Sequence, residues 1–163
     1  MYPVCITRFN DITYNERKSW CTKHNFKGSI YGCPNMINSA ILQDQKIIVL
    51  EMNNSINKIV GIGIIYNKLN LTNHRYKIYD DNNYNRYIYK SDKYIDISNL
   101  DKIDGIIFDK IDAKIIEQIE LLLFKGKRNY KRGQGIQRIP LYIRELKSIN
   151  IEHFINTLVS KLI

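Results

Sequence analysis

The stretch KIIVLEMNNSINKIVGIGIIYN, residues 46–67, decides the fold. Residues 46–52 are rich in β-branched side chains and predict one strand, and residues 58–67 predict a second. The Asn and Ser residues between them are typical of a turn, because Asn tolerates left-handed backbone and bonds to its own main chain. Two strands joined by so short a loop predict a β-hairpin. Gly61 and Gly63 lie two apart on the second strand, which opens one face of it to a bulge or to close approach by another backbone or a ligand.

Short extended pieces and helical patterns flank this hairpin. Before it, we predict an extended piece ended by a proline turn and a short helix that Asn35 caps, over 29–34 and 35–41. After it, aromatic strands are predicted at 76–80, 86–90 and 93–97, and helices at 109–124 and 149–162. These elements predict an α+β fold with a curved sheet or partial β-barrel flanked by helices.

The chain length of 163 residues fits one domain, and its composition supports a packed core. Residues 1–27 are polar and show no clear hydrophobic period. We therefore interpret 1–27 as a polar N-terminal extension and 28–163 as a single domain.

Cysteine usage and hydropathy indicate an intracellular protein. Cys5, Cys21 and Cys33 cannot all pair, and none lies in a C-x-x-C motif, so a reducing compartment is predicted. Cys21, His24 and Cys33 lack the second close pair of a zinc site, and we predict neither metal nor cofactor. There is no secretory signal, and no apolar run approaches the roughly 18–20 residues of a membrane span. The predicted location is the cytoplasm, or a viral factory or virion if the protein is viral, with no membrane partner.

The charge balance points to a polyanionic partner. Lys and Arg number 25 against 16 Asp and Glu, a formal net charge of +9. Such a surplus raises the affinity for polyanions through counterion release. Coding from an AT-rich genome also enriches Lys, so the position of the charges matters more than their number.

The positive charges cluster in KGKRNYKRGQG, residues 125–135. The segment from 125 to 144 holds no acidic residue and seven basic ones: Lys125, Lys127, Arg128, Lys131, Arg132, Arg138 and Arg144. Its glycines let backbone N–H groups approach an anion. The predicted phosphate-binding residues are Lys125, Lys127, Arg128, Lys131 and Arg132, and the alternative is a solvated loop.

A band of tyrosines lies between residues 76 and 94. Its members alternate with basic residues and are Tyr76, Tyr79, Tyr84, Tyr87, Tyr89 and Tyr94. On a strand, Tyr87 and Tyr89 share one face and, if exposed, would stack on bases of single-stranded RNA. The alternative is that these aromatic residues are good strand formers and no more.

The order of these segments resembles the YTH domain and, more broadly, the PUA-like superfamily that includes EVE and ASCH domains. The matching segments are Tyr31-Gly-Cys, KIIVLEM, NNSINK, IVGIGII, Arg86-Tyr87-Ile88-Tyr89 and Lys131-Arg132-Gly133-Gln134. The resemblance implies a β-barrel with helices around it and a pocket for one flipped base, which is methylated adenine in YTH proteins. Tyr31 would stand at the first tryptophan of the aromatic cage, and Lys131 near an RNA phosphate. No matched cage position is a tryptophan, and Arg132 replaces an acid of the motif.

These observations predict an RNA-binding module, with single-stranded DNA as the alternative ligand. The residues expected to contact a base are Tyr31, Asn53, Asn54 and Tyr87, because aromatic faces stack and Asn side chains read base edges. No H-E-x-x-H, G-x-S-x-G or zinc-deaminase motif occurs, so an enzyme is not indicated. Two alternatives stay open, a small nuclease or nucleotide-modifying enzyme and a viral protein associated with the genome.

Overall fold

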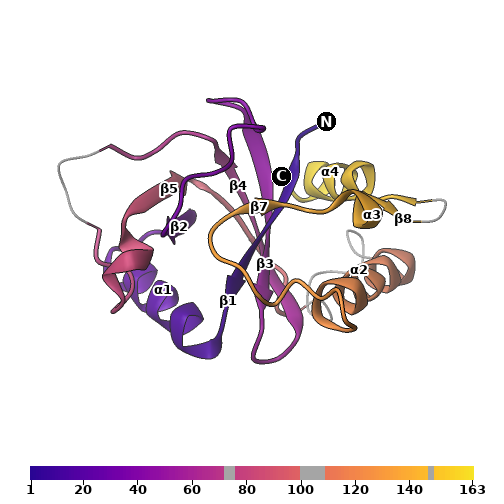
Figure 1. Cartoon of the computed structure of the whole chain (residues 1–163), viewed down its shortest axis with the longest axis horizontal. Helices are drawn as coiled ribbons and strands as arrows, with labels where there is room; N and C mark the ends of the chain where they lie inside the picture. The colour runs from indigo at the N-terminus through magenta and orange to yellow at the C-terminus, as the bar shows by residue number, and fades with distance from the viewer. Residues whose placement is uncertain (72–75, 100–108, 147–148) are drawn as a thin grey trace.

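A computed structural model describes residues 1–71, 76–99, 109–146 and 149–163. Its strands are β1 (Val4–Phe9), β2 (Ser29–Cys33), β3 (Lys46–Asn53), β4 (Lys58–Tyr66), β5 (Tyr87–Ser91), β6 (Lys93–Asp96), β7 (Gln137–Arg138), β8 (Glu145–Leu146) and β9 (Ile149–Asn150). Its helices are α1 (Asp11–Lys23), α2 (Lys110–Phe124), α3 (Leu141–Arg144) and α4 (Ile151–Leu162), with a 3-10 turn, η1 (Asn82–Asn85). A mixed five-stranded sheet in the order β6-β4-β3-β1-β7 forms the centre (Figure 1). The α+β class is confirmed, and the central sheet is not a closed barrel.

The predicted hairpin is confirmed. β3 and β4 pair antiparallel along their length, with a bulge between Glu51 and Met52. The turn that joins them includes Asn57 in left-handed conformation (φ 53°), as the Asn-rich sequence indicates. The following strand pattern at 93–97 is confirmed as β6, which adds to the outer edge of β4.

The N-terminal segment differs from the expected polar extension. β1 lies inside the sheet, where it pairs parallel with β3 from Val4 to Phe9, and α1 follows it directly. Five of its six residues are buried. Thr7 and Arg8 interrupt its apolar run, and the partner strand that supplies its hydrogen bonds is about forty residues away, so no local pattern marks it.

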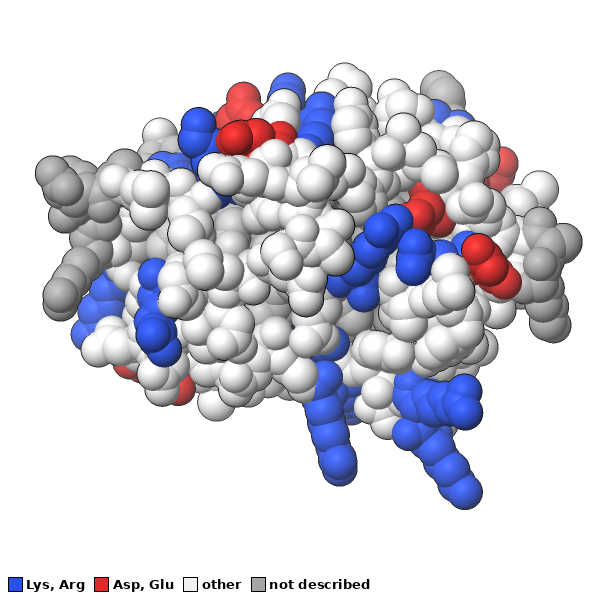
Figure 2. All heavy atoms as spheres, turned by 45° about the horizontal axis from the view of Figure 1, so that its top comes forward, with Lys and Arg blue, Asp and Glu red and all other residues white. Residues whose placement is uncertain are grey.

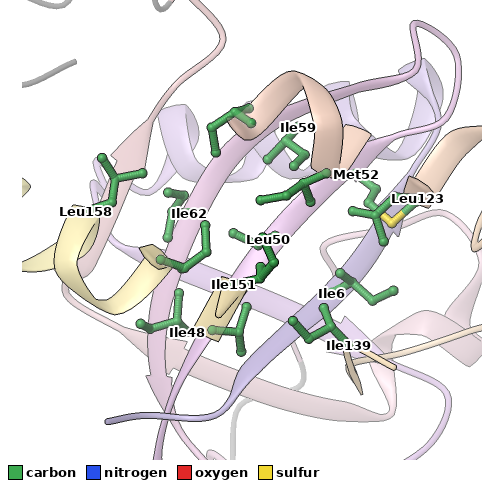
Figure 3. Packing of buried hydrophobic residues seen from close by; sticks show 14 of the residues in the cluster. Ile6, Ile48, Leu50, Met52, Ile59, Ile62, Leu123, Ile139, Ile151 and Leu158 are labelled. Carbon is green, nitrogen blue, oxygen red and sulfur yellow. The ribbon is translucent and has the colours of Figure 1, made fainter. Parts of the chain in front are cut away.

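Both faces of the sheet are covered, which explains the nearly continuous apolar sequence of the hairpin. Ile48, Leu50 and Ile62 pack against α2 and α4 on one face (Figure 3). Val49 and Ile65 face the opposite layer, which contains the two-stranded sheet of β2 and β5. Among the described helices, none has the length and hydropathy to cross a bilayer.

The helices predicted at 109–124 and 149–162 are confirmed as α2 and α4, whereas two other predictions are wrong. Residues 35–41 form no helix, because the Asn38 side chain and carbonyl accept from nearby amides and close a turn instead. Residues 76–80 form no strand, because the amides of Ile78 and Tyr79 both donate to the side chain of Asn85.

Gly61 and Gly63 give two tyrosine hydroxyls access to the face of β4. A Cβ at Gly61 would lie 2.5 Å from the Tyr94 hydroxyl. A Cβ at Gly63 would overlap the Tyr31 hydroxyl and lie 2.7 Å from Oγ of Ser29. The close approach that the sequence predicted is therefore made by Tyr31 and Ser29 from β2 of the neighbouring layer and by Tyr94 from β6 of the same sheet.

Gly63→Ala is expected to lower the free energy of unfolding by about 1–3 kcal/mol, because the added methyl overpacks this contact. Urea denaturation measures the change, with Ser39→Ala in an exposed turn as the control. An unchanged unfolding midpoint for Gly63→Ala would contradict the packing described.

Candidate nucleic-acid interface

The basic loop, residues 125–135, connects α2 to β7 and exposes most of its cations. Lys125, Lys127, Arg128 and Arg132 are exposed, and Lys131 is partly buried. Figure 1 shows this loop running from the end of α2 across the front of the central sheet to β7, and Figure 2 shows Lys and Arg side chains projecting from the lower edge of the molecule. The sequence-predicted phosphate-binding residues therefore lie together on the surface.

The five basic residues of the loop differ in their ion pairing from Arg138 and Arg144, the two basic residues that follow them in the sequence. Arg138 and Arg144 both pair with Glu152, at 3.0 and 4.0 Å. Of the ion pairs among described residues, none includes a cation of the basic loop. The charge of the loop is thus available to an external anion, whereas Arg138 and Arg144 share the single negative charge of Glu152.

Two side chains of the central sheet hold the basic loop in place. Nε of Arg8 donates to the carbonyl of Tyr130, and Nδ2 of Asn54 donates to the next carbonyl, that of Lys131, at 2.8 Å. Arg8 Nη2 also donates to Gln137 Oε1 at 2.8 Å. Burial lowers the pKa of Arg8, but a guanidinium stays protonated in proteins. The two hydrogen bonds that Arg8 donates are therefore charge-assisted.

Arg8→Met is expected to loosen the basic loop while leaving the core packed, because the thioether keeps the apolar stem but cannot donate. Losing a charge-assisted bond of about 1.5–3 kcal/mol should speed amide exchange in residues 126–135 by roughly tenfold or more. Hydrogen exchange measured by mass spectrometry tests this, with Lys114→Met on the exposed side of α2 as the control. Equal exchange in both variants would show that Arg8 does not anchor the loop.

A pocket of about 210 Å³ opens beside the basic loop, where β1 ends and α1 begins. Its lining combines aromatic rings with side chains that donate and accept hydrogen bonds: Thr7, Arg8, Phe9, Asn10, Thr13, Tyr31, Gly32, Asn54, Tyr79, Tyr84, Lys131, Gly133, Gln134 and Gly135. Gly133 and Gly135 have positive φ, 112° and 72°, which lets the loop fold around the pocket. The volume is below the roughly 300–1,000 Å³ of pockets for drug-sized ligands and suits one small flat group.

Two polar atoms in residues of the pocket wall lack partners. Nη1 of Arg8 and Oδ1 of Asn54 are buried, and neither has a hydrogen-bond partner among the described residues. One is a donor and the other an acceptor. A buried polar group left unpaired costs about 1–3 kcal/mol, and because neither atom is exposed to the pocket, neither is a contact for a ligand in this structure.

The four residues expected to contact a base divide into two pairs. Tyr31 and Asn54 line the pocket together with Lys131. Asn53 does not line it, because it is 3 % exposed and its side chain bonds to Asp11 and to the amide of Ser55. Tyr87 does not line it either and is partly buried on β5.

The tyrosine band forms no exposed pair of rings at Tyr87 and Tyr89. Tyr89 is buried, and its hydroxyl accepts from the amide of Ile37 at 2.9 Å. Of the band, Tyr79 and Tyr84 reach the pocket, in an edge-to-face contact with ring centroids 6.2 Å apart. The aromatic character of the pocket therefore comes from the segment around η1 and from β2.

A buried ion pair, between Arg17 and Glu51, lies next to the hydroxyl of Tyr31. Arg17 of α1 donates through its two terminal nitrogens, Nη1 and Nη2, to the two carboxylate oxygens of Glu51 of β3. The hydroxyl of Tyr31 donates to Glu51 at 2.7 Å, and that of Tyr94 at 3.3 Å. Burial lowers the pKa of Arg17, but Glu51 more than offsets this and holds it well above its ordinary value. Burial and Glu51 both raise the pKa of Tyr31, which stays a neutral donor.

Sequence reasoning missed Arg8, Asn10 and Tyr84 as pocket residues, and Arg17–Glu51 as their support. The signal for Glu51 was present, since it is a charged residue within a predicted apolar strand, whereas Arg8 lies in a strand that the sequence did not predict. A buried charge of this kind needs a partner, but the strand pattern does not say which one.

No family model, curated protein or solved structure matches this chain. Within the described ranges, no group of three or more His, Cys, Asp or Glu side chains is placed to hold a metal ion. Cys5 and Cys33 are buried, and burial raises the pKa of each thiol to about 12, so neither is a reactive thiolate at neutral pH.

Proposed function

We propose that this protein binds single-stranded nucleic acid, with RNA preferred, through the basic loop and the adjoining pocket. The observation that carries the proposal is the set of five loop cations, which have no ion-pair partner among the described residues and lie beside a pocket with aromatic walls. Phosphates of the strand contact the cations, and one unpaired base enters the pocket.

The phosphate contacts supply most of the affinity. Lys and Arg release counterions when they neutralise phosphates, and Arg128 and Arg132 can each grip a phosphate with two nitrogens. The hydrogen bonds from Arg8 and Asn54 to the carbonyls of Tyr130 and Lys131 hold the loop in one conformation. This lowers the conformational entropy that the loop loses on binding.

The pocket adds recognition of a base. Its small volume admits a base that has left the stack, and Tyr84 offers aromatic surface to it. Thr7, Asn10 and Thr13 in its lining carry hydroxyl and amide groups that can donate to and accept from a base edge. Unpaired bases are the usual target of sequence-specific RNA recognition, which favours single-stranded RNA over a duplex.

A PUA-like architecture of the YTH or EVE type is part of this proposal. Tyr31 and Lys131 are the residues that the resemblance would place at the base and at the phosphate, and both line the pocket. Tyr31 is 1 % exposed, so its ring has almost no free surface on which a base could stack. Tyr84 is therefore our choice for the stacking ring.

Titration of the purified protein with a fluorescent single-stranded RNA at several salt concentrations tests the proposal. Five phosphate contacts predict a slope of log affinity against log salt of about −3.5. Single-stranded DNA, duplex DNA and heparin are the comparison ligands. Equal affinity for heparin and RNA would favour a general polyanion surface, and cleavage of the RNA with Mg²⁺ or Mn²⁺ present would favour the nuclease alternative.

A further inference from the structure

A groove of about 450 Å³ continues from the pocket along residues 134–138. The pocket and the groove share Gln134 and Gly135 in their linings, so they are neighbours along one path. The opposite wall of the groove is the turn segment 35–41, the region expected to be a helix. Because that segment forms a turn, it leaves this space beside β7.

The lining of the groove is an apolar floor with an amide rim. Ile41 and Ile136 are buried beneath it, while Met36 is 59 % exposed and Ala40 is exposed. The rim carries four side-chain amides: Asn35, Asn38, Gln134 and Gln137. A flat apolar surface bordered by amides suits a nucleobase, which presents an apolar face and a polar edge.

The positive charge differs between the two ends of this path. Lys131 and the basic loop lie at the pocket end. Arg138 lies at the far end, where Glu152, a carboxylate that it shares with Arg144, accepts from its guanidinium at 3.0 and 3.2 Å. Phosphate contacts therefore concentrate beside the pocket, and the groove holds a base and not a phosphate.

We infer that the groove is a second nucleotide subsite, which holds the base adjacent to the one in the pocket. This inference rests on the proposed function. The two hollows meet at Gln134 and Gly135, where positive φ at Gly135 turns the chain. One strand can thus cross from the pocket to the groove at these two residues, beside the Gln134 amide that donates to the Tyr84 hydroxyl at 3.4 Å.

The test compares an RNA mononucleotide with a dinucleotide and uses Ala40→Leu, which fills the groove without adding charge. Ser39→Leu, one residue away and outside the lining, is the matched control. We expect the dinucleotide to bind roughly tenfold tighter than the mononucleotide to the natural chain and to Ser39→Leu, from the stacking and contacts of one more base. Ala40→Leu should lose this gain and keep its affinity for the mononucleotide.

A gain that persists in Ala40→Leu would overturn the subsite while leaving the proposed function intact. Absence of binding by any nucleotide or longer RNA to the natural chain would overturn both.

Methyl NMR of the natural chain gives a readout that needs no variant. The dinucleotide should shift the Met36 methyl signal and leave buried Met52 unmoved. An unmoved Met36 signal with bound dinucleotide would also overturn the subsite.

Discussion

Lys131→Glu/Arg132→Glu is expected to weaken binding of single-stranded RNA by about 100-fold at low salt. Each reversal replaces an attraction to phosphate by a repulsion, and a cost of about 1.4 kcal/mol for each is a factor of ten. The slope of log affinity against log salt should fall by about 1.4, since each phosphate contact on a single strand contributes about 0.7. The loss should be similar for RNAs of different sequence, because phosphate contacts do not read bases.

The matched control is Lys110→Glu/Lys114→Glu. These two exposed lysines lie in the first turns of α2, and the double change alters the net charge by the same amount. The basic loop follows the other end of this 15-residue helix, about 22 Å from Lys110 and about 16 Å from Lys114 along its axis. Equal losses in the two double variants would show that net charge, and not the basic loop, binds the RNA.

Glu51→Ala is expected to destabilise the fold by about 3–5 kcal/mol. Its carboxylate is fully buried and is the partner of Arg17, so its removal leaves a buried guanidinium without a counter-charge. The hydroxyls of Tyr31 and Tyr94 also lose the acceptor that they share. The free energy of unfolding from urea denaturation measures the effect.

The double variant Arg17→Met/Glu51→Leu separates the cost of a stranded charge from the cost of lost packing. It removes both charges and fills the space, so it should be far more stable than Glu51→Ala and close to the natural chain. A loss of similar size in both variants would mean that the ion pair is not what Glu51 contributes. Binding by the double variant also reports whether Tyr31 needs its acceptor to shape the pocket.

Elements built from contacts close in sequence were predictable. The hairpin of β3 and β4 follows from two β-branched runs around an Asn turn, and α2 follows from apolar spacing with an acidic N-cap at Asp109. The basic loop was predictable for the same reason, since its cations and glycines are consecutive. Each of these features depends on neighbours a few residues apart.

The pocket was not predictable in this way, because it joins segments far apart in the chain. Arg8 reaches the backbone of Tyr130, and Asn54 reaches that of Lys131. The prediction for Tyr31 and Tyr87 treated aromatic residues on short strands as exposed, but the layer of β2 and β5 packs against the central sheet and buries one ring and half-buries the other. Burial depends on which elements pack together, and a strand pattern does not contain that information.

The amino-acid sequence by itself determined the local elements and the run of positive charge, because propensity, turn chemistry and composition act over short distances. Only the tertiary structure decided that β1 enters the sheet, that Arg17 meets Glu51, and that a pocket and groove lie beside the basic loop. These features arise from long-range pairing and packing, where the free energy depends on surfaces that come together only when the chain folds.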